Sequence, residues 1–369
     1  MWNSESRPLS RGERDSSALS SLVAEAIADR VFPGAVLRID DLNGSGVLAE
    51  ICTGRVSTSP QGACVRASTS FDVASLTKVF SATVALRLVS QGALSLSATV
   101  PEVLGAGAGH LEGVTVRQLL EHRSGLPAWR PFFEAKIPVL QSALQEPLES
   151  KPGTRHCYSD VGFLVLMAVL EQVSGLPYRH LMSREVLVPL GLNDTGFRPA
   201  GLGETAAMSL LKEGCFAATE RCSYRGLLCG EVHDDNTWAM GGVAAHAGLF
   251  ASAAQLGAFA RAWWQAPAID YLPESLRDQA WSSPAPGGTH VLGWDTVSEQ
   301  GSSAGTKLSR SSHGHLGFTG TSLWVDPDRA IAVTFLCNRV HPTRERPELI
   351  RSFRPVLHDA VVDFVDGVQ

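Results

Sequence analysis

The feature that most constrains the fold is a β-hairpin pattern at each end of the chain, with helical sequence between them. Two β-like runs, 35–39 and 47–52, flank the turn-forming segment Asp-Asp-Leu-Asn-Gly. Near the other end, runs 322–325 and 330–337 flank Asp-Pro-Asp. This arrangement predicts an α+β fold (an α/β sandwich). Both termini would build one antiparallel sheet flanked by helices, with a mostly helical region inserted.

The middle of the chain is dominated by apolar helical stretches. We expect a discontinuous sheet domain over 18–75 and 285–369, a mostly helical region over 76–284 and a polar leader over 1–17. The segment 266–286 is rich in Pro and Ala and is predicted to be an exposed excursion. The predicted helices span 18–31, 75–89, 161–173, 256–264 and 348–365.

Composition disfavours several classes of protein. The 369 residues carry a net charge of -6, which argues against a nucleic-acid partner because such a surface needs clustered Lys and Arg. No run of eighteen apolar residues occurs, so no transmembrane segment is expected. The N-terminus has no apolar signal core, which predicts a cytoplasmic protein, or a periplasmic one if a leader was removed. The odd count of seven cysteines indicates thiols rather than a disulfide framework.

Ser75 and Lys78 open the first apolar helix. Side chains three residues apart share a helix face, so Ser Oγ and Lys Nζ can meet. With Asp72 as N-cap, the Ser75 N–H would lack an intrahelical acceptor and could donate to an oxyanion. Burial disfavours an ammonium ion, so we expect the pKa of Lys78 to fall toward that of a useful base. The structural alternative is a capping serine beside a lysine whose charged end reaches water.

Two further motifs follow in order. Tyr158-Ser159-Asp160 precedes the second apolar helix, where Tyr158 could relay protons, or could pack in the core while Ser159 or Asp160 caps the helix. His315-Leu316-Gly317-Phe318 precedes the final hairpin. There Gly317 would let a substrate approach an edge strand, and the Phe318 N–H could be a second oxyanion donor. His315 could orient a substrate carboxylate or carbonyl, although a lone histidine at a strand start is usually structural.

Other motifs favour structural roles. His233-Asp234-Asp235 with His246 would suit a metal ion, but the Ser75 and Lys78 chemistry needs none, so we expect no metal and no cofactor. His122 ends a helix-to-turn segment and is expected to pin a loop. No G-x-S-x-G elbow occurs, which disfavours an α/β-hydrolase. Three tryptophans could line an acyl pocket but are expected to belong to the core: Trp129, Trp238 and Trp294.

The order Ser-x-x-Lys, Tyr-x-Asp and His-x-Gly resembles the serine β-lactamase-related hydrolases: class C β-lactamases, family VIII carboxylesterases and D-alanyl-D-alanine peptidases. The resemblance covers most of the chain from about Phe32 onward. It implies that Ser75 is acylated, that Lys78 and Tyr158 manage its proton and that Asp160 helps bind substrate. It also implies that the N–H groups of Ser75 and Phe318 form the oxyanion hole. Further family-like stretches are LLEHRSGLP at 119–127, PLGLNDT at 189–195, GEVHDDN at 230–236, HAGLF at 246–250 and NRVHP at 338–342.

Two positions depart from the family pattern. His315 stands where β-lactamases and most transpeptidases have lysine, which weakens recognition of a substrate carboxylate. Asp160 stands where many members have asparagine, and a carboxylate cannot donate an amide proton. We therefore expect a carboxylesterase-like hydrolase of small esters that works through an acyl-enzyme on Ser75.

Several alternatives stay open beside the esterase. They are a peptidoglycan-directed D,D-peptidase or amidase, a weak class C-type β-lactamase and, from another class, a non-catalytic acyl- or β-lactam-binding module. The expected partner is a small-molecule ester, amide or β-lactam substrate. The sequence leaves the oligomeric state open.

Overall fold

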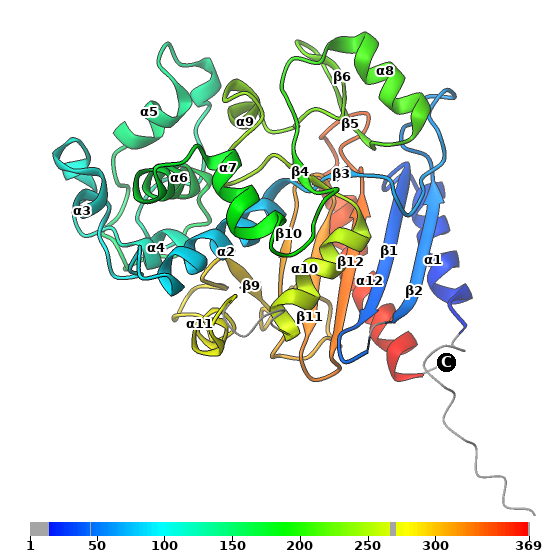
Figure 1. Ribbon diagram of the computed structural model, residues 1–369. Coiled ribbons are helices and arrows are strands. Elements are labelled where there is room, and N and C mark those ends of the chain that lie inside the picture. The colour runs from blue at the N-terminus through cyan, green and yellow to red at the C-terminus, as the bar shows by residue number, and fades with distance from the viewer. Residues whose placement is uncertain (1–14, 45, 266–270, 368–369) are drawn as a thin grey trace, which may run out of the picture.

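A seven-stranded antiparallel sheet forms one half of the molecule (Figure 1). The computed structural model describes residues 15–44, 46–265 and 271–367. The strand order is β2-β1-β12-β11-β10-β9-β8, and β1 pairs with β12, so segments from the two ends of the chain meet in one sheet. This confirms the predicted fold class. The strands are β1 Gly34–Asp41, β2 Val47–Gly54, β8 His290–Val291, β9 Trp294–Thr296, β10 His313–Leu316, β11 Ser322–Asp326 and β12 Ile331–Cys337.

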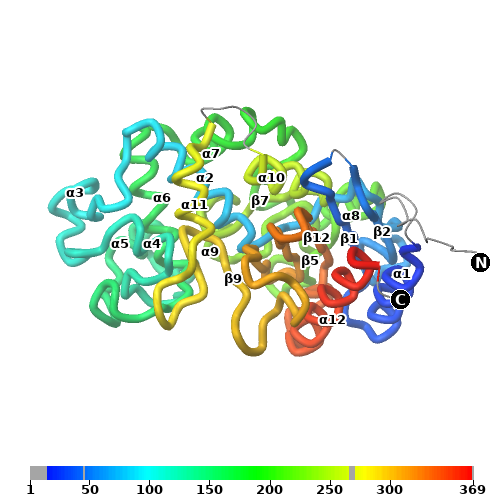
Figure 2. Tube along the Cα trace, turned by 90° about the horizontal axis from the view of Figure 1, so that it is seen from below, coloured from blue at the N-terminus to red at the C-terminus, as the bar shows by residue number. Residues whose placement is uncertain are grey.

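Helices cover both faces of the sheet. On one face α1 (Ser17–Ala28) and α12 (Pro347–Asp366) pack side by side, as Figures 1 and 2 show. On the other face α10 (Ala253–Gln265) packs against β1 and β12. Because β12 is covered from both sides, all seven of its residues are buried, and its sequence IAVTFLC is apolar almost throughout.

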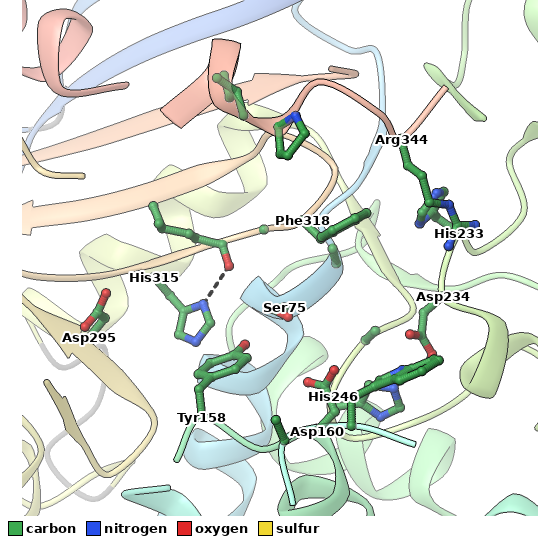
Figure 3. A pocket seen from close by; sticks show the side chains of 18 of the residues that line it. Ser75, Tyr158, Asp160, His233, Asp234, His246, Asp295, His315, Phe318 and Arg344 are labelled. Atoms are coloured by element: carbon green, nitrogen blue, oxygen red, sulfur yellow. Dashed lines mark hydrogen bonds and ion pairs between the residues drawn. The ribbon is translucent and has the colours of Figure 1, made fainter. Parts of the chain in front are cut away.

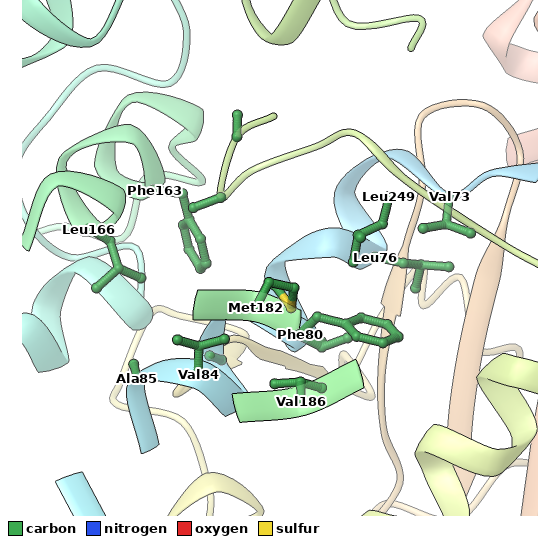
Figure 4. Close-up of a cluster of buried hydrophobic side chains, with 14 of the residues drawn as sticks. Val73, Leu76, Phe80, Val84, Ala85, Phe163, Leu166, Met182, Val186 and Leu249 are labelled. Carbon is green, nitrogen blue, oxygen red and sulfur yellow. The ribbon is translucent and has the colours of Figure 1, made fainter. Parts of the chain in front are cut away.

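The other half of the molecule is mostly helical and is centred on α2 (Thr77–Ser90). Every residue of α2 from Thr77 to Leu86 is buried. Its side chains pack against α6 (Asp160–Ser174) and the segment around Met182 (Figure 4). The ring of Phe80 stacks on that of Phe259 of α10, with ring centres 4.0 Å apart. Such packing on all sides makes α2 a rigid support for whatever lies at its N-terminus.

Shorter elements complete the fold. β3, β7 and β4 form a three-stranded sheet, and β5 and β6 form a two-stranded one. The remaining helices are α3 Val100–Leu104, α4 Val116–Leu120, α5 Val139–Gln145, α7 Tyr178–Met182, α8 Gly203–Glu213, α9 Asp235–Ala239 and α11 Glu274–Ala280. The 3-10 and π turns are η1 Ala74–Leu76, η2 Ala106–Leu111, η3 Phe132–Glu134 and η4 Ser183–Leu187. The short strands are β3 Phe71–Asp72, β4 Gly196–Phe197, β5 Ala218–Cys222, β6 Gly226–Cys229 and β7 Leu249–Ala251.

The segment 266–286 differs from the prediction. Residues 266–270 lie outside the described part. The stretch 271–281 is no exposed excursion, because Leu272 and Ala280 are buried in the main core beside and within α11, whereas Ser282, Ser283 and Pro286 are exposed as predicted. Of the predicted leader, residues 1–14 also lie outside the described part. The division into domains stays a prediction. Its boundary at 285 falls just before β8 and β9, which extend the sheet.

Two further expectations concern thiols and membranes. All seven cysteines are free in the structure. Among the described helices, none is both long and apolar enough to cross a membrane alone. α6 together with Tyr178–Leu187 passes such a test only as a pair bent by 78°, and ten consecutive residues of α6 are buried inside the protein.

Candidate active site

Ser75 lies in the tight turn η1, between strand β3 and helix α2. The preceding Ala74 has φ +47°, a left-handed conformation that costs a residue with a Cβ about 1 to 2 kcal/mol. The Asp72 carboxylate accepts the N–H groups of Ala74 (2.9 Å) and His233 (2.7 Å). Asp72 was expected to cap α2 directly. Instead it holds the 3-10 turn that precedes α2 and thereby fixes the place of Ser75.

Lys78 is fully buried, and its ammonium group contacts three oxygen atoms. Nζ donates to Ser75 Oγ at 3.0 Å and to the His246 carbonyl at 3.1 Å, and it forms an ion pair with Asp160 Oδ1 at 2.6 Å. Burial alone lowers the pKa of Lys78, but the charge of Asp160 and the contact with Tyr158 outweigh burial, so the pKa is raised. The expectation of a lowered pKa was therefore wrong, because Asp160 compensates the buried charge.

Tyr158 lies beside Lys78, with Nζ 4.8 Å from the centre of its ring. Burial raises the pKa of Tyr158 despite the nearby Lys78, so the resting side chain is a neutral phenol. Ser159 caps α6, since its Oγ accepts the Gly162 N–H at 2.8 Å. The motif therefore has both of the roles considered from the sequence. Ser159 caps the helix, while its neighbours Tyr158 and Asp160 face Lys78.

His315 is buried and closes this side of the site (Figure 3). Its Nδ1 lies 2.8 Å from the Leu316 carbonyl, which assigns the proton to Nδ1 and leaves the buried Nε2 as an acceptor. Burial lowers the pKa of His315 to about 3, so the ring is neutral at physiological pH. A neutral imidazole cannot replace the positive charge of a lysine at this position.

Gly317 is required for a reason that differs from the expectation. A Cβ there would come within 1.9 Å of Thr321 Oγ1 and 2.6 Å of the Val73 carbonyl, so the tight internal packing demands glycine. The adjoining strand β10 pairs with both β9 and β11 and is therefore no edge strand. Thr319 and Thr321 donate hydroxyl protons to the carbonyls of Asp72 and Val73. These bonds tie the 317–321 turn to the segment just before Ser75.

A group of neutral histidines surrounds Tyr158, and sequence reasoning missed its extent. His122, His290 and His315 lie with ring centres 4.4, 5.4 and 5.9 Å from that of Tyr158. His156 Nε2 lies 3.2 Å from His290 Nδ1. Burial lowers the pKa of both His122 and His290 well below the usual range. The four rings come from distant segments, so no local pattern could have indicated the group.

The opposite wall holds the histidines and carboxylates that the sequence raised as possible metal ligands. His246 Nε2 lies 2.9 Å from Asp234 Oδ1, and His233 Nε2 lies 2.9 Å from Glu220. Although burial raises the pKa of Asp234, the pairing with His246 and Thr237 lowers it overall. Over the described residues, no group of three or more His, Cys, Asp and Glu side chains could hold a metal. These pairs stabilise the loop in which the His246 carbonyl accepts a hydrogen bond from Lys78 Nζ.

Most of these groups line one pocket of about 800 Å³, into which Ser75 opens. Its wall includes Tyr158, Asp160, His315, Gly317 and Phe318, so the structure brings the candidate residues together, and Lys78 lies directly behind Ser75. Of the three tryptophans only Trp129 lines this pocket, while Trp294 is buried in the core and Trp238 packs on Arg225. Asp295 also lines the pocket, and burial raises its pKa to about 6.

The family model described as Beta-lactamase matches residues 19–354, so the chain belongs to this family. An N-acetylmuramyl-L-alanine amidase of Bacillus subtilis (strain 168) is 28% identical over 358 residues, covering 86% of this chain and 79% of the relative. Two solved structures share the fold. One is EstCE1, a hydrolase with promiscuous acyltransferase activity, at TM-score 0.73 and 19% identity over 92% of this chain and 98% of the other. The second is simvastatin synthase (LovD) of Aspergillus terreus, at TM-score 0.72 and 17% identity over 94% and 98%.

Fold, motif order and family together define a serine hydrolase of the β-lactamase type. The shared family accounts for the seven-stranded sheet with its helical insertion. It leaves open which acyl compound the pocket accepts.

Proposed function

We propose that the protein hydrolyses acyl compounds through a covalent intermediate on Ser75, with small carboxylic esters as its first class of substrate. The observation that carries the proposal is the contact of 3.0 Å between Ser75 Oγ and the buried Lys78 Nζ at the base of the pocket. A serine is a weak nucleophile unless an adjacent base removes its proton, and Lys78 is the basic group in contact with Ser75 Oγ.

The reaction needs Lys78 in its neutral form. Once Lys78 has lost a proton, it accepts the Ser75 hydroxyl proton while Oγ bonds to the substrate carbonyl carbon. The N–H groups of Ser75 and Phe318 stabilise the oxyanion, and within the described residues neither has a hydrogen-bond acceptor in the protein. Tyr158 and Lys78 return a proton to the leaving group, and water then cleaves the acyl-enzyme.

The preference for neutral esters rests on the charge of the pocket beside Ser75. His315 is neutral, and Asp160 adds a carboxylate next to the nucleophile. A substrate carboxylate placed against His315 would meet a neutral ring where β-lactamases supply a lysine. Esters also need less activation of the leaving group than amides.

An amidase acting on a muramyl amide is the second candidate. The relative named as an N-acetylmuramyl-L-alanine amidase matches 86% of this chain. A pocket of about 800 Å³ exceeds the needs of a simple butyrate ester and has room for an amino sugar. A cytoplasmic location, which stays a prediction, would fit recycled muropeptides as well as esters.

The test compares the wild-type protein with Ser75→Ala on p-nitrophenyl butyrate, N-acetylmuramyl-L-alanine, nitrocefin and a D-alanyl-D-alanine peptide. Turnover and intact mass are followed together. Ser142→Ala, a change at a buried serine of α5, is the matched control and is expected to keep wild-type rates.

We expect ester turnover and an acyl adduct that Ser75→Ala abolishes. Faster cleavage of the muramyl amide than of the ester would move the second candidate to first place, and rapid nitrocefin hydrolysis would favour the β-lactamase alternative. Absence of turnover and of any adduct would leave the non-catalytic binding module and end the enzyme proposal.

A further inference from the structure

The peptide that joins Gly317 to Phe318 has an unusual partner on the side away from its N–H. Arg354 of helix α12 reaches this turn, and its Nη2 donates to the Gly317 carbonyl at 2.8 Å and to the Thr321 carbonyl at 2.7 Å. The Gly317 N–H in turn donates to the Thr321 carbonyl at 2.7 Å. One guanidinium group thus closes the turn that carries the Phe318 N–H.

Arg354 brings a buried positive charge to this turn. Only 6% of the residue is exposed, and within the described residues no carboxylate forms an ion pair with it. Burial lowers the pKa of Arg354 to about 10, so the group remains a cation at neutral pH. An uncompensated buried charge is costly, and its retention needs a reason beyond the stability of the fold.

The geometry of the peptide supplies that reason. A trans peptide is planar, with its C=O and N–H pointing to opposite sides. Because the Gly317 C=O points at Arg354, the Phe318 N–H of the same peptide points away from it. A cation at the carbonyl oxygen draws electron density from the peptide nitrogen, which makes the N–H a stronger donor.

We propose that Arg354 is a positioning residue of the oxyanion hole: it fixes the orientation of the Gly317–Phe318 peptide and strengthens the Phe318 N–H as a donor. This inference rests on the proposed acyl-enzyme function. Nη2 itself is not free to hold a substrate anion, because it is already bonded to two backbone carbonyls.

The test replaces Arg354 by Met and by Lys and compares both with Arg277→Met. Arg277 is a matched control: its Nη1 also donates to two backbone carbonyls, those of Trp263 and Trp264, and its buried Nε also lacks a partner, but it does not line the pocket. Each protein is mixed with p-nitrophenyl butyrate carrying ¹³C at the carbonyl carbon. The carbonyl stretching band of the acyl-enzyme and the values of kcat and KM are then measured.

We expect Arg354→Met to lower kcat about tenfold to a hundredfold with KM changed less than about threefold, since the oxyanion is bound only in the transition state. Its acyl carbonyl band should move to higher wavenumber, because a weaker donor polarises the carbonyl less. Arg354→Lys keeps the charge and should restore part of both effects. Added guanidinium chloride at low concentration should raise the rate of Arg354→Met and leave Arg277→Met unchanged.

Three outcomes overturn the inference. An unshifted carbonyl band in both Arg354 variants shows that the residue does not act on the oxyanion hole, even if activity falls. Equal losses of kcat in Arg354→Met and Arg277→Met indicate a general effect on stability. If the wild-type protein forms no acyl band at all, the proposed function fails, and the inference falls with it.

Discussion

At the scale of single residues, the charge state of Lys78 depends on one neighbour. The Asp160 carboxylate, 2.6 Å from Nζ, raises the pKa of Lys78 where burial alone would lower it. The resting site therefore holds an ammonium group that donates to Ser75, and the basic form of Lys78 becomes populated only as the pH rises. The rate of acylation should follow that population.

Replacing Asp160 by Asn should move the acidic limb of the kcat/KM profile to lower pH, by about 1 to 3 units, the range that one nearby opposite charge typically gives. The sign follows from the ion pair: removing the carboxylate removes the stabilisation of the ammonium form, so the neutral amine appears at lower pH. The measurement is kcat/KM for p-nitrophenyl butyrate between pH 5 and 10, a range in which the wild-type profile should still be rising with pH.

Asp235→Asn is the control for this experiment. Asp235 lines the same pocket but forms its ion pair with Arg225, so the limb should stay in place. An acidic limb that stays fixed in Asp160→Asn would mean that Lys78 is not the base that the profile reports.

The residues of the candidate site could be named from the sequence, but the charges of several could not. Ser75 and Lys78 share a helix face, so their contact was accessible to a local argument. Asp160 and His246 reach Lys78 from distant segments, and their effect on its pKa required the fold. Arg354 gave no signal, because an arginine in an amphipathic C-terminal helix is ordinarily a surface residue.

At the scale of secondary-structure elements, His122 joins the end of α4 to the start of α6. It has φ +55°, its carbonyl accepts the Cys157 N–H, and its Nδ1 accepts the Ser159 N–H at 2.9 Å. The expectation that His122 pins a loop describes these contacts. The loop it holds is the one that presents Tyr158 and Asp160 to Lys78.

Three substitutions at His122 separate backbone strain from hydrogen bonding. Asn tolerates a left-handed φ and can accept the Ser159 N–H through Oδ1, so His122→Asn should keep kcat/KM within about threefold of wild type. Gly relieves strain but offers no acceptor, and Ala lacks both properties. The Gly and Ala variants should each lose at least tenfold in kcat/KM. His122→Ala should also melt at a lower temperature than His122→Gly, since the left-handed φ costs alanine about 1 to 2 kcal/mol.

Enzyme assays and thermal melts of the three variants check this expectation. A His122→Gly variant as active as the wild type would show that the hydrogen bond to Ser159 does not position the loop.

At the scale of the whole molecule, buried neutral histidines couple stability to pH. The pKa values of His341 and His358 fall to about 4 through burial, that of His315 to about 3, and those of His122 and His290 lie well below the usual range. Each folded pKa lies below that of the unfolded chain, near 6.5. The unfolded state therefore binds more protons between the two values, and the free energy of unfolding decreases as the pH falls below 6.5.

Urea unfolding at several pH values between 5 and 6.5 should show this loss. A histidine that stays neutral in the fold contributes up to about 1.4 kcal/mol per pH unit in that window. Asp295, with its pKa raised to about 6, opposes the trend by a single proton. His358→Gln should reduce the slope by about one histidine's share, and a stability independent of pH would contradict the neutral, buried state of these rings.

The fold class could be predicted because each end of the chain carries a recognisable hairpin pattern. The helices between the two hairpins are also apolar enough to require burial. What could not be predicted were the short pieces whose neighbours are distant in the chain. β8 and β9 have two and three residues, too few for a periodic pattern. The buried part of 266–286 looked exposed because Pro and Ala are frequent in the segment, but Tyr271, Leu272, Leu276 and Ala280 belong to the core.

The pairing of β1 with β12 also orders events during synthesis on the ribosome. Ser75 and Lys78 emerge early, but strand β12 and the turn that carries Phe318 leave the exit tunnel more than two hundred residues later. Arg354 emerges later still. The nascent polypeptide therefore exposes its nucleophile long before the groups that would make it reactive, and a ribosome-bound chain stalled before β11 should remain chemically inert.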